Sequence, residues 1–139
     1  MIAGQTPSND RAADRVAGVR DALAAAKIPD QAFTVVEAVY SFEAGGSAFV
    51  ELICQSPRPT AIICGNDVLA VGAIKKAKEM GMSVPEDVSV VGFDDIELAT
   101  VVEPNLTTVH VPHKRMGQAA TQLLLKLRDN QTGCQSIEL

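Results

Sequence analysis

The sequence predicts an α/β fold: a three-layer, doubly wound parallel sheet with helices on both faces. Short runs of apolar and β-branched residues alternate with stretches in which apolar residues recur every three or four positions. Such runs are typical of strands buried on both faces, and the longer spacing is typical of amphipathic helices. Strand followed by helix recurs along the whole chain, and this alternation requires parallel strands joined by right-handed crossovers.

The first half of the chain supplies two strand and helix pairs. Residues 1–4 have the composition of the end of a strand, and a helix is expected over 10–27. Its apolar stripe is formed by residues at helical spacing: Val16, Val19, Leu23 and Ala26. The β-branched run 33–39 predicts the next strand, and 44–55 a short helix with two glycines in its first turn.

The second half repeats the pattern. Strands are expected in three apolar runs: 60–64, 88–91 and 106–111. Helices are expected at 67 to about 80, at 96–102 (short) and at 112 to about 128. Gly81 is placed to end the first of these helices in a left-handed conformation.

Length and composition narrow the function classes. The 139 residues suffice for one domain, and no apolar run or N-terminal signal indicates membrane insertion or export. A net charge of −5 with scattered Lys and Arg argues against a nucleic-acid surface within this chain. The chain has an odd number of cysteines, and they are not spaced as metal ligands are: Cys54, Cys64 and Cys134. This predicts reduced thiols and a cytoplasmic location.

Polar or aromatic side chains follow successive predicted strands. They are Tyr40, then Asn66 with Asp67, then Asp94 with Asp95. Open parallel sheets bind ligands beyond the carboxyl ends of their strands, and Arg15 on the first helix is long enough to reach the same edge. One cation, an amide, carboxylates and a ring suit a polyhydroxylated or heterocyclic small molecule.

Each of these residues also has a purely structural interpretation. Asn66 and Asp67 are suited to cap the following helix, and we expect that role of Asp67 in particular. Asp94 and Asp95 can cap the short helix after them, a role we expect of Asp95. Tyr40 can close the edge of the core, and Arg15 can pair with an acidic neighbour on its own helix.

An enzyme that holds a metal at the adjacent aspartates is a further alternative. Neighbouring residues on an extended strand point to opposite sides, which does not favour shared coordination. No His or Cys cluster supports the pair, because His110 and His113 lie too far along the chain. We therefore predict no metal, no cofactor and no enzymatic activity.

Five motifs, spread over nearly the whole chain, lie at 15–18, 58–73, 81–95, 104–109 and 116–117. In this order they resemble the lactose-repressor (LacI/GalR) family of bacterial transcription regulators. The resemblance implies a periplasmic-binding-protein-like type I subdomain. The segments Val-Pro-Glu-Asp and Leu-Thr-Thr-Val look like the repressor branch of that fold rather than the transport branch.

The resemblance also implies residue roles. Arg15, Asn66 and Asp94 match positions that hold a sugar-like or nucleobase-like effector, and Tyr40 matches a position at which an aromatic ring often stacks on it. The predicted helix from Asp67 and the segment 98–102 match the family's dimer contacts. Three valines there lie off the predicted core stripes and indicate a homodimer interface: Val68, Val71 and Val102.

The family's helix-turn-helix module and first effector subdomain have no counterpart in the chain. We expect residues 1–111 to form the second subdomain, truncated at its N-terminus, and 112–139 a crossover helix and tail belonging to the first. In this chain that helix exposes the face of Leu123, Leu124 and Leu127, so we expect it to repack, to pair with a second copy or to be poorly ordered.

The predicted function is allosteric. An effector bound between two subdomains favours one closure angle and thereby controls DNA binding through the absent module. With half of the cleft absent, the chain alone should bind effector weakly or not at all. The alternative is a periplasmic-type sugar-binding protein of a transport system, and the upstream coding sequence distinguishes the two.

Overall fold

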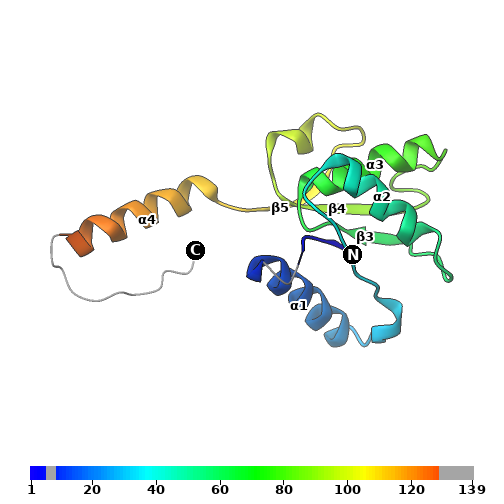
Figure 1. Cartoon of the computed structure of the whole chain (residues 1–139), viewed down its shortest axis with the longest axis horizontal. Helices are drawn as coiled ribbons and strands as arrows, with labels where there is room; N and C mark the ends of the chain where they lie inside the picture. Colours follow the sequence, from blue (N-terminus) through cyan, green and yellow to red (C-terminus); the bar gives the residue numbers. More distant parts are fainter. Residues whose placement is uncertain (6–8, 129–139) are drawn as a thin grey trace. The chain divides into compact units, whose positions relative to one another are not determined.

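The computed structural model describes residues 1–5 and 9–128 and contains the alternating strands and helices (Figure 1). The elements are β1 (Ile2–Ala3), α1 (Asp10–Ala25), η2 (Asp30–Ala32), β2 (Val36–Glu37), α2 (Phe42–Ile53), β3 (Ala61–Ile63), α3 (Asp67–Glu79), β4 (Ser89–Asp94), η3 (Glu97–Thr100), β5 (Thr107–His110) and α4 (His113–Arg128). They form two compact units, Met1–Val109 and His110–Leu139.

The strands of the first unit follow a doubly wound order. β1 pairs with β2 in parallel, with Ile2 opposite Val36, and β3 pairs with β4 in parallel, with Ile62 opposite Val90. β5 follows on the other side of β4. A parallel bridge between Ile2 and Cys64 joins the two sets of strands, so the order across the unit is β2-β1-β3-β4-β5.

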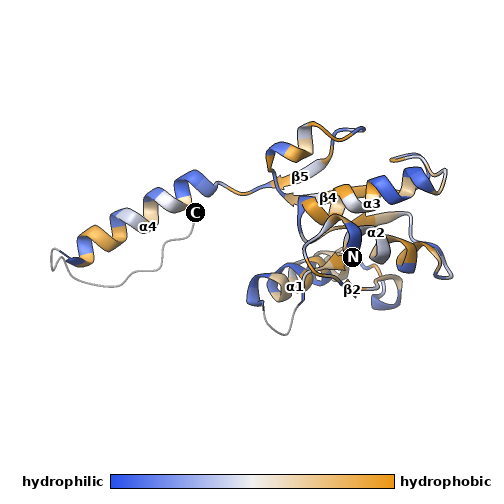
Figure 2. Cartoon of the chain, turned by 45° about the horizontal axis from the view of Figure 1, so that its top comes forward, coloured by the Kyte–Doolittle hydropathy of each residue, from blue (hydrophilic) through white to orange (hydrophobic). Residues whose placement is uncertain are grey.

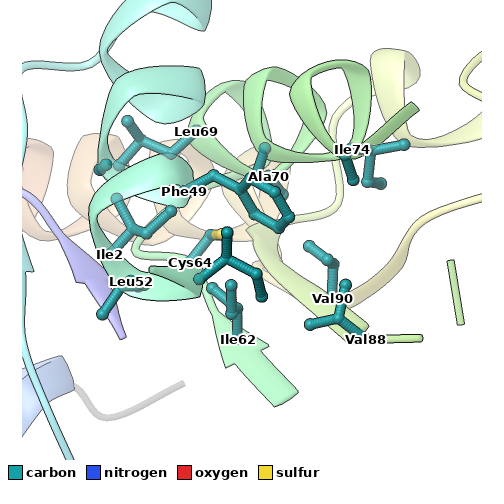
Figure 3. Close-up of a cluster of buried hydrophobic side chains, with 14 of the residues drawn as sticks. Ile2, Phe49, Leu52, Ile62, Cys64, Leu69, Ala70, Ile74, Val88 and Val90 are labelled. Atoms are coloured by element: carbon teal, nitrogen blue, oxygen red, sulfur yellow. The ribbon is translucent and has the colours of Figure 1, made fainter. Parts of the chain in front are cut away.

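Two apolar clusters on opposite faces of the strands give the unit its three layers. Consecutive strand residues point to opposite faces. Ile2 and Ile62 belong to the larger cluster, which includes the inner faces of α2 and α3 (Figure 3). Ala3 and Ile63 belong to the smaller cluster, with Val16 of α1. The predicted three-layer α/β fold is thus confirmed.

The strand predicted at 33–39 is much shorter than expected. Only Val36 and Glu37 form a ladder, because their partner strand β1 is itself two residues long. Phe33 ends the preceding turn of 3-10 helix instead of starting the strand. α2 also begins earlier than predicted, because the Ser41 side chain accepts a hydrogen bond from the amide of Ala44 and so caps it.

Small residues allow α2 and α3 to pack unusually closely. A Cβ on Gly72 would lie 2.2 Å from the carbonyl oxygen of Phe42, and a Cβ on Gly45 2.4 Å from that of Leu69. The two glycines therefore let the backbone of each helix approach the other directly. Further along, Gly81 has a φ of +74°, which confirms the predicted left-handed residue after α3.

The second unit contains α4, whose side chains are all at least partly exposed. Leu124 is 66% exposed, Met116 and Leu127 are also exposed, and Leu123 is half-buried, so most of the predicted apolar face is exposed. Figure 2 shows the helix coloured by hydropathy. No helix within 1–5 and 9–128 is long and apolar enough to cross a membrane. The sequence of residues 136–139 could begin a further strand, but these residues lie outside the described part of the chain.

The two described cysteines should differ sharply in reactivity. Cys64 is 1% exposed, and burial raises the pKa of its thiol to about 12, whereas Cys54 is exposed. Thiolate is the reactive species, so Cys64 should remain unmodified at pH 8 in the folded chain. In a Cys134→Ser variant, Ellman's reagent should titrate one thiol rapidly and the second only in denaturant; rapid reaction of both would contradict this assignment.

Candidate functional site

The candidate site lies where the direction of strand addition reverses. β1 leads to β2 on one side, and the next strand, β3, is placed on the other side of β1. In doubly wound sheets, loops leaving the carboxyl ends of the strands on either side of such a switch diverge and create a place for a ligand. Here the two divergent loops begin at Gly4 and Gly65.

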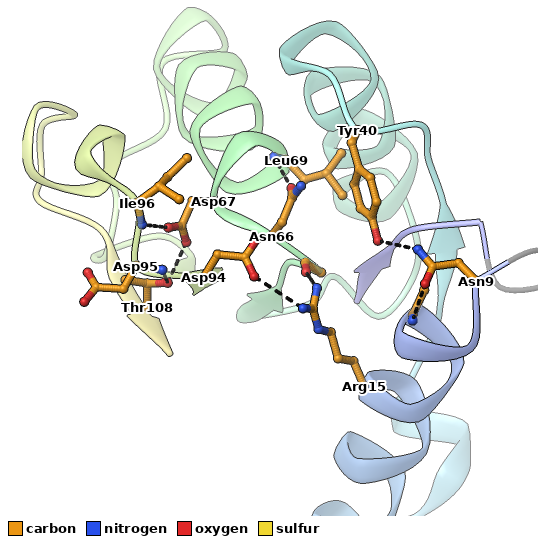
Figure 4. A network of polar contacts seen from close by, with 12 residues as sticks. Asn9, Arg15, Tyr40, Asn66, Asp67, Leu69, Asp94, Asp95, Ile96 and Thr108 are labelled. Carbon is orange, nitrogen blue, oxygen red and sulfur yellow. Dashed lines mark hydrogen bonds and ion pairs between the residues drawn. The ribbon is translucent and has the colours of Figure 1, made fainter. Parts of the chain in front are cut away.

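Arg15 connects α1 to this edge. One guanidinium nitrogen donates to the backbone oxygen of Gly65, and the other donates to Oδ1 of Asp94 over 3.3 Å (Figure 4). The guanidinium carbon also lies 3.9 Å from the centre of the Phe93 ring, within cation–π distance. The side chains of Arg15 and Asp94 remain 22% and 25% exposed, so the pair is held in place yet accessible to a ligand.

Asp94 and Asp95 have an unusual backbone conformation. Their φ angles are +107° and +55°, in a region that side chains other than glycine rarely occupy. Each such residue costs on the order of 1–3 kcal/mol, and residues of this kind cluster at functional sites. The backbone turns at these two residues, and this turn directs the Asp94 side chain toward Arg15.

Asn66, and not Asp67, caps α3. Its side-chain oxygen accepts a hydrogen bond from the amide of Leu69 over 2.9 Å. The expectation that Asp67 caps this helix is therefore wrong: Asp67 is fully buried and its carboxylate has other partners. Asp95 does not occupy a cap position either, because the residue that precedes η3 is Ile96.

Tyr40 follows β2 and covers the backbone at the end of β1. A Cβ on Gly4 would lie 2.2 Å from the Tyr40 hydroxyl, which itself accepts a hydrogen bond from the Asn9 side chain over 3.3 Å. The ring is 45% exposed and borders a pocket of about 530 Å³. This pocket is lined by Gln5, Asn9, Asp10, Arg11, Ala38, Val39 and Tyr40.

The structure thus joins some of the predicted site residues directly and leaves others separate. Arg15 and Asp94 are in contact, whereas Tyr40 lines a pocket whose lining includes neither of them. Phe93 beneath Arg15 was not predicted, although its position immediately before Asp94 on a strand was a usable signal. Asn9 was also missed; its place before the first helical run is typical of an N-cap, and it does cap α1.

The valines predicted to form a dimer interface are only partly exposed. Val71 and Val102 pack against the larger core cluster, and Val68 is half-buried. The most exposed apolar side chain of this region is Val101, at 70%, in the segment 98–102. Among residues 1–5 and 9–128, no group of three or more His, Cys, Asp or Glu side chains is placed to hold a metal ion.

The domain class follows from the fold and the site together. A family model described as a periplasmic binding protein-like domain matches residues 1–137. The chain belongs to this family, as a doubly wound sheet with an accessible polar site at its switch point suggests.

Curated relatives and solved structures indicate which members of this domain family the chain resembles. The HTH-type transcriptional repressors PurR of Photorhabdus laumondii and Proteus mirabilis are 41% and 40% identical over 123 and 126 residues, covering 88% and 90% of this chain. The chain spans 36% and 37% of the length of these repressors. Within the domain family the chain is similar to LacI/GalR regulators, and its relatives are named as repressors rather than enzymes.

Two solved structures agree with this placement. A LacI-family transcriptional regulator from Burkholderia phymatum superposes with a TM-score of 0.83 at 34% identity, over 98% of this chain and 49% of that one. The Lac repressor dimer bound to operator and the anti-inducer ONPF superposes with a TM-score of 0.86 at 31% identity, over 94% of this chain and 45% of the repressor chain.

Proposed function

We propose that this chain is a ligand-sensing part of a bacterial transcriptional repressor and that it contributes Arg15, Asn66, Asp94 and Tyr40 to an effector site. The Arg15–Asp94 pair is the observation that carries the proposal. It places a cation and a carboxylate side by side, partly exposed, at the switch point of the sheet. A neutral ligand with both donors and acceptors, such as a sugar or a nucleobase, can bind both groups.

Each group contributes a different kind of contact. Asp94 accepts from ligand hydroxyl or ring N–H groups, and Arg15 donates to ligand oxygen or ring nitrogen atoms. The exposed Tyr40 ring offers an apolar face on which a sugar or base can stack. The Asn66 amide nitrogen, which capping does not use, is a further donor.

The wider regulator is proposed from its relatives. One matched structure is a Lac repressor dimer on operator DNA with ONPF, and another is a complex of the regulator CelR with cellobiose. By analogy, the protein acts as a homodimer in the cytoplasm, with Val68, Val71 and Val102 at its interface. Residues 112–139 then cross into a first subdomain, and a separate module binds DNA.

A thermal-shift screen tests this proposal. The panel contains cellobiose and other mono- and disaccharides, nucleobases and nucleosides, each tested on the 139-residue chain and on the longest protein that its gene encodes. One compound should raise the Tm of the longer protein by several degrees when it is well above its Kd, and the chain alone should respond weakly or not at all. Arg15→Ala should remove the shift; an unchanged shift would contradict the assigned site.

A further inference from the structure

Asp67 is the one charged side chain in the described part of the chain that is fully buried. Its Oδ2 accepts a hydrogen bond from the amide of Ile96 over 2.9 Å, and its Oδ1 accepts from the hydroxyl of Thr108 over 2.5 Å. The Thr108 oxygen in turn accepts from the amide of Asp95 over 3.3 Å. The carboxylate thus joins α3, the turn after β4, and β5 (Figure 4).

These hydrogen bonds run in one direction only. A hydroxyl has a single proton, and Thr108 gives its proton to Asp67 while it accepts from Asp95. The Ile96 amide is also a donor, so Asp67 must accept at both oxygens. An ionised carboxylate does so with charge-assisted hydrogen bonds at both oxygens. An Asn amide carries no charge and has one acceptor oxygen, and its NH2 group can meet Thr108 only if the hydroxyl rotates and accepts instead of donating.

The neighbouring backbone is shaped around this carboxylate. A Cβ on Gly92 would lie 2.2 Å from Oδ1 of Asp67 and 2.8 Å from Cδ2 of Leu106. Gly92 lies in β4, two residues before Asp94, and its missing side chain gives Asp67 the space to pass. The buried position of the Asp67 carboxylate therefore depends on the glycine at position 92.

We propose that Asp67 is a positioning residue for the Arg15–Asp94 site. Asp67 holds the amide of Ile96 directly, and through its hydrogen bond to Thr108 it also fixes the hydroxyl that accepts from the amide of Asp95. Two consecutive residues of this turn have positive φ angles that the chain would otherwise leave. Asp67 fixes this turn, and the turn in turn presents Asp94 to Arg15. The importance of this for ligand recognition rests on the proposed function, but the geometry itself is testable without a ligand.

NMR of the ligand-free 139-residue chain provides two readouts. The first is hydrogen exchange at the Ile96 amide, which donates to Asp67, compared with exchange at the Leu69 amide, which donates to Asn66. The second is the chemical shift of the Arg15 side chain, which the ring current of Phe93 displaces at a distance of 3.9 Å. Asp67→Asn should accelerate Ile96 exchange about tenfold or more relative to Leu69, and should move the Arg15 shifts toward random-coil values.

Matched variants separate positioning from general stability. Thr108→Val removes the hydroxyl that links Asp67 to the Asp95 amide and should move the Arg15 signals in the same direction. Thr108→Ser keeps this hydroxyl and should leave the signals in place. Ile74→Val lowers stability through the core alone and should also leave the Arg15 signals unchanged. If Asp67→Asn does not fold, Thr108→Val decides the question.

Unchanged Arg15 shifts in a folded Asp67→Asn or Thr108→Val chain would overturn the positioning role. This outcome is distinct from failure of the proposed function, which would appear as a screen without a ligand or as binding that does not depend on Arg15.

Discussion

Replacing Gly72 by Ala is expected to cost about 3 kcal/mol of unfolding free energy, the upper part of the usual range for overpacking. The new Cβ would lie 2.2 Å from the Phe42 carbonyl oxygen, 2.9 Å from its carbonyl carbon and 3.0 Å from its Cα. All three are backbone atoms at the start of α2, so no side-chain rotation relieves the contact. The helices must separate, and the core beneath them, including Leu69 and Phe49, loses packing.

The glycines of the chain offer a graded control series. A Cβ on Gly18 in α1 would have no neighbour within 4 Å, so Gly18→Ala should stabilise the helix by about 0.5–1 kcal/mol. A Cβ on Gly46 would have its nearest neighbours at 3.4 Å, which is ordinary contact, so Gly46→Ala should lie between the two. Urea unfolding followed by circular dichroism measures all three; a Gly72→Ala variant as stable as Gly18→Ala would refute the close helix contact.

The order of strands and helices could be predicted from the sequence because it depends on local periodicity. The helix expected from Asp67 to about residue 80 is observed as Asp67–Glu79, and its left-handed exit at Gly81 is confirmed. The length of β2 could not be predicted, because it is limited by the number of residues available in β1. That is a property of the partner strand.

The candidate site, like the fold, could be predicted from the sequence only in part. Position after a strand was enough to select Asp94, and side-chain length was enough to select Arg15; the two meet across 79 positions of sequence. Position alone could not distinguish the adjacent Asn66 and Asp67, since both residue types cap helices. Their roles are decided by Thr108 and Ile96, which are distant in sequence and whose approach to Asp67 depends on how β5 and the turn after β4 pack.

Conversion of Asp94 to Asn should weaken effector binding by about 10- to 100-fold, while Asp95→Asn should change it less than about threefold. Hydrogen bonds to a charged group contribute about 1.5–3 kcal/mol, and Asn keeps the size of Asp and tolerates a positive φ. Asp94 faces Arg15, whereas the backbone amide of Asp95 is directed to Thr108. The two variants carry the same change in charge at neighbouring positions.

Because the chemical change is identical, a difference between the variants reports position and not net charge. Calorimetric titration with the panel compound that gives the largest thermal shift measures the two Kd values on the longest protein that the gene encodes. A loss of affinity confined to Asp94→Asn would identify the carboxylate beside Arg15 as the group that contacts the effector. Equal losses in both variants would instead indicate a long-range charge effect, and a loss confined to Asp95→Asn would place the effector on the other side of the turn, away from Arg15.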